Sequence, residues 1–218
     1  MIEKIKFILS NVQSLIFPSF CESCSLHITD DQLFCDDCAT SIEKISSTSL
    51  KISDNKSLAV HAFSKYSGTI KKLILRKNNG QQKTFKKLAR LTLRNISPNL
   101  VTADYFIPIP LHWSRKLWRG YNQSEILAKE YADISNQMML NSIERTTKTK
   151  PQSSLDKNAR ELNVKNVFNI KESMSDLLYG KEIILVDDVM TTGATLVEAA
   201  RLLYKYKPKK ITALVVCR

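Results

Sequence analysis

The sequence predicts an α/β fold in which helices cover both faces of a mainly parallel sheet. Strand-like and helix-like segments alternate from Leu58 onward, which is the pattern of such folds. Two strand candidates, 182–186 and 211–217, are apolar throughout, as is typical of strands buried on both faces. A helical pattern at 194–206 lies between them, where a crossover between parallel strands would run.

The other elements follow in chain order. Apolar residues at steps of three and four predict a helix over 2–16, which Pro18 ends. We then expect a strand at 58–66, helices at 69–77 and 83–95, a short buried strand at 104–110, a helix from Asn122 and a strand at 166–170. The polar stretch 46–57 is interpreted as a linker. The predicted units are therefore a helix with a cysteine-rich segment at 1–45, the linker, and an α/β domain over 58–218.

Length and composition fit a globular protein. The 218 residues and a hydrophobic content of 43% suffice for one domain with a small second unit. We expect no transmembrane segment, because the apolar runs are short, and no secretory signal is visible. The predicted localisation is cytoplasmic, with contact to the inner membrane only through protein partners.

Charge is unevenly distributed along the chain. Residues 1–50 hold three Lys and seven Asp or Glu, so the net charge of +12 comes from the remainder. Between Lys65 and Arg94 there are ten Lys or Arg and no acid. Such a field attracts polyanions, although a solvated surface of a basic protein is the alternative. With only five glycines, the chain has neither G-x-G-x-x-G nor G-x-x-x-x-G-K-[ST], so two common phosphate motifs are excluded.

Four cysteines predict a structural zinc site. Cys21-x₂-Cys24 and Cys35-x₂-Cys38 are separated by ten residues, a spacing that suits tetrahedral coordination by four thiolates. The segment has few large apolar residues, so metal binding would supply its folding energy. A redox pair and a finger without metal are the alternatives, with His27 as a less suitable substitute ligand. The acids around the cysteines repel phosphate, which favours protein contact or scaffolding for this unit.

An acid pair and a hydroxyl-rich turn follow the strand at 182–186. In open α/β sheets ligands bind beyond the carboxyl ends of the strands, where Asp187 and Asp188 lie. Because neighbouring residues of a strand face opposite ways, a shared site requires the chain to leave the sheet there. The following "TTGAT", 191–195, offers backbone N–H groups at a helix start. The pattern indicates a sugar phosphate, with carboxylates on ribose hydroxyls or Mg²⁺; helix capping beside solvated acids is the alternative.

Three stretches carry a family resemblance. "ILVDDVMTTGATL" is similar to the phosphoribosyl pyrophosphate binding motif of type I phosphoribosyltransferases. Together with the four cysteines, "IPIPLHWSRKLWRGYNQSEILAKEY" and "RTTKTKPQSSLDKNARELNVKNVF", it makes the chain resemble the ComF family over nearly its full length. The resemblance implies a type I phosphoribosyltransferase fold carrying a small N-terminal helix and zinc-knuckle unit. It also implies a role in DNA uptake during natural transformation.

The resemblance also assigns roles to residues. Asp187 and Asp188, the catalytic pair of an active enzyme, should meet the ribose hydroxyls with Mg²⁺ nearby. The residues expected to hold the 5-phosphate are Thr191, Thr192, Gly193, Ala194 and Thr195. Those expected to hold pyrophosphate are Arg115, Lys116 and Arg119, with a generic basic surface as the alternative. The segment 145–163 resembles a mobile loop, in which Lys150, Gln152 and Arg160 are weaker candidates.

The chain also departs from the enzymes that it resembles. Thr191 stands where hypoxanthine-type transferases carry an acid near the base, although adenine and orotate enzymes lack that acid too. Only Arg218 follows the strand at 211–217, so we expect no C-terminal segment that builds a nucleobase pocket. The half of the site that would bind an acceptor is not recognisable.

Single-stranded DNA is the predicted macromolecular ligand. Lys83, Lys87, Arg90 and Arg94 recur at helical spacing as one stripe, with Lys86 beside it. Trp113 and Trp118 could stack unpaired bases, or they could pack a loop onto the core. No motif for double strands is present.

Two hypotheses follow for the function. The first is a DNA-uptake factor that binds phosphoribosyl pyrophosphate, Mg²⁺, single-stranded DNA and a helicase-type partner. The alternative is an active phosphoribosyltransferase with an unidentified acceptor. A relic of a salvage enzyme that serves only as a protein adaptor is a third interpretation.

Overall fold

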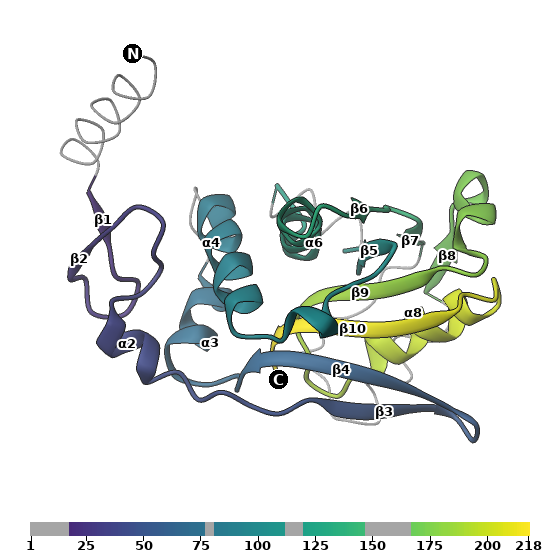
Figure 1. Ribbon diagram of the computed structural model, residues 1–218, viewed down its shortest axis with the longest axis horizontal. Helices are drawn as coiled ribbons and strands as arrows, with labels where there is room; N and C mark the ends of the chain where they lie inside the picture. The colour runs from purple at the N-terminus through teal and green to yellow at the C-terminus, as the bar shows by residue number, and fades with distance from the viewer. Residues whose placement is uncertain (1–17, 77–80, 112–119, 147–166) are drawn as a thin grey trace, which may run out of the picture.

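A six-stranded sheet forms the centre of the protein. The computed structural model describes residues 18–76, 81–111, 120–146 and 167–218 (Figure 1). The strand order is β3-β4-β10-β9-β5-β6, and all neighbours are parallel except β3 and β4. The strands are β3 (Thr48–Ser53), β4 (Lys56–Ser64), β5 (Tyr105–Pro108), β6 (Met138–Met139), β9 (Glu182–Val189) and β10 (Lys210–Cys217). The predicted α/β class with a mainly parallel sheet is confirmed.

Helices cover the two faces of this sheet. They are α3 (Gly68–Leu75), α4 (Gln81–Arg94), α6 (Gln123–Ile134) and α8 (Ala194–Tyr204). Short 3₁₀ turns at Pro98–Leu100, Glu172–Met174 and Asp176–Leu178 lie in the connections that precede β5 and β9. Buried residues of α3, α4 and α6 form one apolar layer with the sheet. Those of α8 form the second layer on the opposite face. The helices lie close to the segments where the apolar periodicity predicts them.

The strand β9 shows why its sequence is apolar without alternation. Ile184 and Val186 contribute to the layer under α4 and α6, whereas Ile183 and Leu185 contribute to the layer under α8. All four are at most 1% exposed. Burying each side chain stabilises the fold by about 1.5–3 kcal/mol, so β9 is fixed firmly before the chain reaches Asp187.

The predicted linker 46–57 is wrong for most of its length. Thr48–Ser53 forms β3, an edge strand that pairs antiparallel with β4. The pair Ser53↔Lys56 leaves Asp54 and Asn55 as a two-residue hairpin loop, a turn composition that favours tight hairpins. Polar residues are frequent in β3 because one face of an edge strand meets water. The division into units at 1–45 and 58–218 stays a prediction.

Two smaller sheets complete the described fold. In the cysteine-rich unit, β1 (Ser19–Phe20) pairs with β2 (His27–Ile28), and the short helix α2 (Asp36–Thr40) follows. Elsewhere β7 (Ile143–Arg145) pairs with β8 (Phe168–Ile170). The strand predicted at 166–170 is therefore present as β8, but outside the main sheet. The helix predicted at 2–16 lies outside the described residues.

The cysteine-rich unit packs against the α/β domain. Figure 1 shows it beside α3 and α4, at the end of the molecule away from β8. Its buried residues Leu33 and Phe34 belong to the same apolar cluster as Ile74 and Phe85 of these helices. The contact fixes the unit on the domain. In the described parts of the chain, no helix has the length and apolar character needed to cross a membrane.

Candidate functional site

Asp187 and Asp188 lie where strand β9 loses one of its two neighbouring strands. On one side β9 keeps its pairing with β10 through Val189. On the other side β5 ends at Pro108, opposite Val186. The expectation that the chain leaves the sheet at the acids holds only on the β5 side. The start of α6 occupies the space beyond β5, because the Asn122 amide donates to the carbonyl oxygen of Ile109 over 3.0 Å.

Two donors on one oxygen fix the carboxylate of Asp187. The Ser124 hydroxyl donates to Asp187 Oδ1 over 2.8 Å, and the backbone N–H of Asp188 donates to the same oxygen over 3.0 Å. Asp187 Oδ2 has no hydrogen bond to any residue that the structure describes. Burial, and then the neighbouring Asp188 carboxylate, raise the pKa of Asp187 well above its ordinary value. One oxygen is therefore held while the other can meet a ligand.

Ser124 is a site residue that sequence reasoning missed. The helix α6 begins after Asn122, whose side chain accepts the Ser124 N–H over 3.2 Å and caps the helix. This cap was detectable, since a helix start was expected at Asn122. The contact from Ser124 to Asp187 spans 63 residues of sequence, so no local pattern reveals it.

The turn before α8 has the backbone of an anion-binding site. After Met190, whose N–H donates to the Cys217 carbonyl over 2.9 Å, three residues form a bend up to the helix. Within the described residues, the N–H groups of Thr191, Thr192 and Gly193 have no hydrogen-bond acceptor. The Ala194 N–H makes a long contact of 3.4 Å to the Thr192 hydroxyl. Free N–H groups at a helix start attract phosphate.

Gly193 holds this turn in a conformation that only glycine adopts easily. Its φ is +78°, in the left-handed region. A Cβ at this position would lie 2.5 Å from Leu50 Cδ1 of β3. The edge strand β3, which the sequence suggested to be a linker, therefore packs directly beneath the turn. Leu50 is the second residue of the site that the sequence did not reveal.

Other predicted ligand residues fall outside the described part of the chain. These are the pyrophosphate candidates Arg115, Lys116 and Arg119, the aromatic candidates Trp113 and Trp118, and the loop candidates Lys150, Gln152 and Arg160. All of them stay predictions. Tyr121, next to the first group, is partly buried and packs on Phe85 with ring centroids 6.4 Å apart.

The four cysteines converge on one point. The sulfur atoms of Cys21, Cys24, Cys35 and Cys38 all lie within 4.8 Å of one another, and all four thiols are free. The Cys24 and Cys35 sulfurs are 3.6 Å apart. Tetrahedral zinc with Zn–S bonds of about 2.3 Å separates its sulfurs by about 3.8 Å, so this donor set fits a zinc knuckle.

Local structure explains how the two cysteine pairs meet. Ser25, just after Cys24, has a positive φ of 62° and donates its N–H to the Cys21 carbonyl over 2.9 Å. This tight turn brings the first two sulfurs to the same side. Cys35 precedes α2, and the Ala39 N–H donates to the Cys35 carbonyl over 2.9 Å. We call the segment 18–45 the zinc knuckle.

The basic stripe of α4 faces acids of the protein itself. Lys83 Nζ lies 2.8 Å and Lys87 Nζ 3.7 Å from Asp30 Oδ1 of the zinc knuckle. Arg94 pairs with Asp31 at 3.8 Å. Arg90 reaches the other way and donates to Glu130 of α6 over 2.7 Å. Lys86, beside the stripe, is exposed and forms no ion pair with a described residue. Predicted DNA contacts at these residues are therefore in competition with internal acids.

The fold and the turn before α8 define the class of protein. A mainly parallel sheet, an acid pair at the end of its central strand and a glycine turn into the next helix make a phosphoribosyltransferase domain of type I. The family model described as "Phosphoribosyl transferase domain" matches residues 123–218, from α6 through β10.

Sequence relatives narrow the class further. The chain is 34% identical over 134 residues to "Competence protein F" of Haemophilus influenzae, a match that covers 59% of this chain and 57% of that protein. It is 33% identical over 138 residues to "DNA utilization protein YhgH" of Salmonella typhimurium, covering 60% and 59%. It is 34% identical over 115 residues to "Competence protein ComFC" of Bacillus subtilis, covering 51% and 43%. The resemblance to the ComF family is confirmed, although the chain spans less than two thirds of the length of these relatives.

A solved structure with a similar arrangement is the glutamine phosphoribosylpyrophosphate amidotransferase from B. subtilis, complexed with ADP and GMP. Its TM-score is 0.47 at 14% identity, covering 75% of this chain and 34% of that chain.

Proposed function

We propose that this protein is a DNA-uptake factor that binds phosphoribosyl pyrophosphate with Mg²⁺ and also binds single-stranded DNA. The observation that carries the first part is the constellation of Asp187, Asp188 and the turn at Gly193 at one edge of the sheet. Relatives that are named for competence and DNA utilization support the second part.

The sugar phosphate fits this edge by its chemistry. The 5-phosphate would accept hydrogen bonds from the N–H groups of 191–195 at the positive end of α8. The ribose hydroxyls would donate to the acid pair, where Asp187 Oδ2 has no hydrogen bond to a described residue. Carboxylate oxygens are also the ligands that Mg²⁺ prefers, together with phosphate oxygens of the bound molecule. Arg115, Lys116 and Arg119 complete the proposal as the contacts for pyrophosphate.

Single-stranded DNA would follow the stripe on α4. The ion pairs of Lys83 and Arg94 are exposed, and exposed pairs contribute only about 0–1 kcal/mol each. A strand with many phosphates can therefore replace Asp30 and Asp31 at these cations. Lys86 offers a cation with no internal partner among the described residues. Trp113 and Trp118 are proposed to stack the bases.

The protein partner would bind elsewhere. Asp36 and Asp37 are exposed at the start of α2. Their negative charge repels phosphate, so we do not expect DNA on this surface of the zinc knuckle. We assign this surface to a helicase-type uptake protein. The location that follows is the cytoplasm, with contact to the inner membrane through partners.

The DNA part is tested by its dependence on salt. Anisotropy with a labelled single strand should show log K falling with log salt by about 0.7 for each phosphate neutralised. Absence of binding by the purified zinc-loaded protein, or binding that salt does not change, would exclude the DNA role.

An active phosphoribosyltransferase is the second candidate, and the match of the transferase domain to 123–218 favours it. In that case the same edge would position the ribose carbon while Mg²⁺ and basic residues stabilise the departing pyrophosphate. Release of pyrophosphate with an acceptor, lost when Asp187→Asn and Asp188→Asn are combined, would establish catalysis. A broad screen of acceptors without turnover would leave binding as the function of the site.

A further inference from the structure

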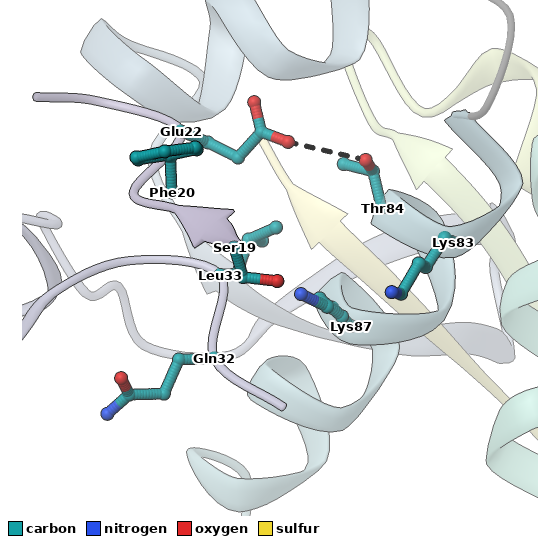
Figure 2. Close-up of a pocket in the computed structure, with 8 residues that line it drawn as sticks. All are labelled: Ser19, Phe20, Glu22, Gln32, Leu33, Lys83, Thr84 and Lys87. Atoms are coloured by element: carbon teal, nitrogen blue, oxygen red, sulfur yellow. Dashed lines mark hydrogen bonds between the residues drawn. The ribbon is translucent and has the colours of Figure 1, made fainter. Parts of the chain in front are cut away.

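A cavity of about 170 Å³ lies between the zinc knuckle and α4 (Figure 2). Five residues of the knuckle and three of α4 line it. A cavity of about 150 Å³ holds a molecule the size of benzene, so this one is large enough for a phosphate group and part of a sugar. It is separate from the acid pair of β9, because no residue of the main sheet lines it.

Lys87 points into this cavity without an acceptor of its own. Its side chain is only 12% exposed, and burial lowers its pKa. Its ammonium donates no hydrogen bond to any described residue, since its nearest carboxylate oxygen, on Asp30, is 3.7 Å away. A poorly hydrated ammonium without an acceptor is unfavourable, so the position favours a ligand that brings oxygen atoms.

The charges around the cavity leave it positive. Lys83 and Lys87 share the single carboxylate of Asp30. Glu22 also lines the cavity, but Arg76 pairs with it and the Thr84 hydroxyl contacts it over 3.4 Å. The charged residues that line the cavity are therefore two cations, Lys83 and Lys87, and one carboxylate, Glu22, and Figure 2 shows both lysines projecting from α4 toward the knuckle. The ligand is expected to be an anion.

The knuckle adds an aromatic surface beside these cations. The Phe20 side chain lines the cavity and is 54% exposed. Its ring meets His27 edge to face, with centroids 6.0 Å apart, which leaves a ring face for stacking. A cation pair next to an exposed ring is the arrangement that holds a phosphate and an unpaired base.

We propose that this cavity is a phosphate-binding site that takes one phosphodiester of a single DNA strand on Lys83 and Lys87, with Asp30 as an internal competitor. The proposal rests on the proposed DNA function for the source of the phosphate. It makes the junction of the zinc knuckle and α4 a nucleic-acid contact. Binding of the strand releases Asp30 from Lys83.

The test uses variants whose effects have opposite signs. In the complete, zinc-loaded chain, Lys87→Gln should weaken binding of a labelled oligothymidylate at least ~10-fold, as expected for a lost charge-assisted hydrogen bond. It should also reduce the salt slope by about 0.7. Asp30→Asn should tighten binding several-fold, since the internal competitor is removed. Zinc content and thermal melts identify any variant that fails to fold, and Lys83→Gln then repeats the test at the more exposed cation.

Matched controls separate the cavity from general electrostatics. Lys72→Gln makes the same charge change on α3 but outside the cavity, and Asp36→Asn does so on the same knuckle. Both should have clearly smaller effects. Equal effects of Lys87→Gln and Lys72→Gln, or of Asp30→Asn and Asp36→Asn, would overturn the cavity site while the DNA function stands.

Calorimetry with inorganic phosphate distinguishes the source of the ligand. Phosphate binding that Lys87→Gln abolishes and Lys72→Gln spares, without any DNA binding, would keep the phosphate site and reject DNA as its source. If the protein binds neither inorganic phosphate nor DNA, this site and the proposed DNA function are overturned together. An acidic peptide that binds in place of the oligonucleotide, in a Lys87-dependent way, would also reject the DNA strand.

Discussion

Ser124 donates its hydroxyl hydrogen to Asp187 across 2.8 Å, although 63 residues separate them in sequence. The start of α6 and the end of β9 thus meet at the edge where β5 stops. The contact orients one oxygen of a carboxylate whose pKa is raised by burial. Any ligand that needs a charged carboxylate at Asp187 should therefore bind with an affinity that depends on the protonation of this residue.

Removing this hydroxyl should change the pH at which the sugar phosphate binds. The hydrogen bond from Ser124 lowers the pKa of Asp187, against the larger effect of burial. Binding of Mg²⁺ and phosphoribosyl pyrophosphate should therefore strengthen as pH rises through the pKa of Asp187, and Ser124→Ala should move this rise to higher pH. Ser124→Thr keeps the hydroxyl and should restore the wild-type profile. Identical profiles for wild type and Ser124→Ala would contradict the role of the contact.

Asp187→Asn should stabilise the protein while it abolishes binding of the sugar phosphate. A group whose pKa is raised by folding contributes stability at low pH, and that contribution is lost as pH rises through the folded pKa. The wild type is therefore destabilised at neutral pH by the buried charge, and the amide removes this penalty. Denaturant unfolding at pH 8 should give the Asp187→Asn variant the higher free energy of unfolding, with a difference that shrinks toward pH 4. A variant that is less stable at pH 8 would contradict the burial of this charge.

Gly193→Ala should destabilise the turn for two reasons that can be separated. The positive φ costs about 1–2 kcal/mol for a residue with a Cβ, and the clash with Leu50 adds to it. Gly180→Ala is the matched control, because its φ is +68° and a Cβ there meets no atom within 4 Å. Thermal melts should show the larger loss at Gly193. In a Leu50→Ala background, Gly193→Ala should lower the melting temperature only as much as Gly180→Ala does. An unchanged excess loss at Gly193 would argue against the packing of β3 beneath the turn.

Removal of zinc should affect the α/β domain as well as the knuckle. Leu33 and Phe34 of the knuckle share an apolar cluster with Phe85 of α4, so loss of the knuckle exposes that helix. Chelator should lower the melting temperature and increase hydrogen exchange in α4 while β9 stays protected. Cys38→Ser should reproduce this effect, whereas Cys217→Ala, outside the cluster of four, should keep a full zinc content. Unchanged exchange in α4 after chelation would contradict the shared core.

The sequence predicts the central elements well because their signals are local. The apolar run 183–186 predicts a doubly buried strand, and the spacing of the cysteines predicts that four sulfurs meet at one point. The contacts that complete the site are not local. Ser124 and Leu50 reach it from α6 and β3, and β3 itself looked like a linker because an edge strand needs apolar residues on one face only.

The stripe on α4 shows a second limit of prediction from sequence. Its spacing correctly places Lys83, Lys87 and Arg94 on one helix face, but a sequence pattern does not tell what that face meets. The structure puts Asp30 and Asp31 against it. Composition alone separated an acidic N-terminal segment from a basic remainder, and in the folded protein these two charges face each other.

The most direct test of the site is calorimetry of phosphoribosyl pyrophosphate with Mg²⁺ on the wild type and on the combined Asp187→Asn and Asp188→Asn variant. We predict saturable, Mg²⁺-dependent binding to one site per chain in the wild type, and its loss in a variant that is folded and retains zinc. Equal binding by both proteins, or no binding by the wild type at millimolar ligand, would contradict the assignment of this edge of the sheet to a sugar phosphate.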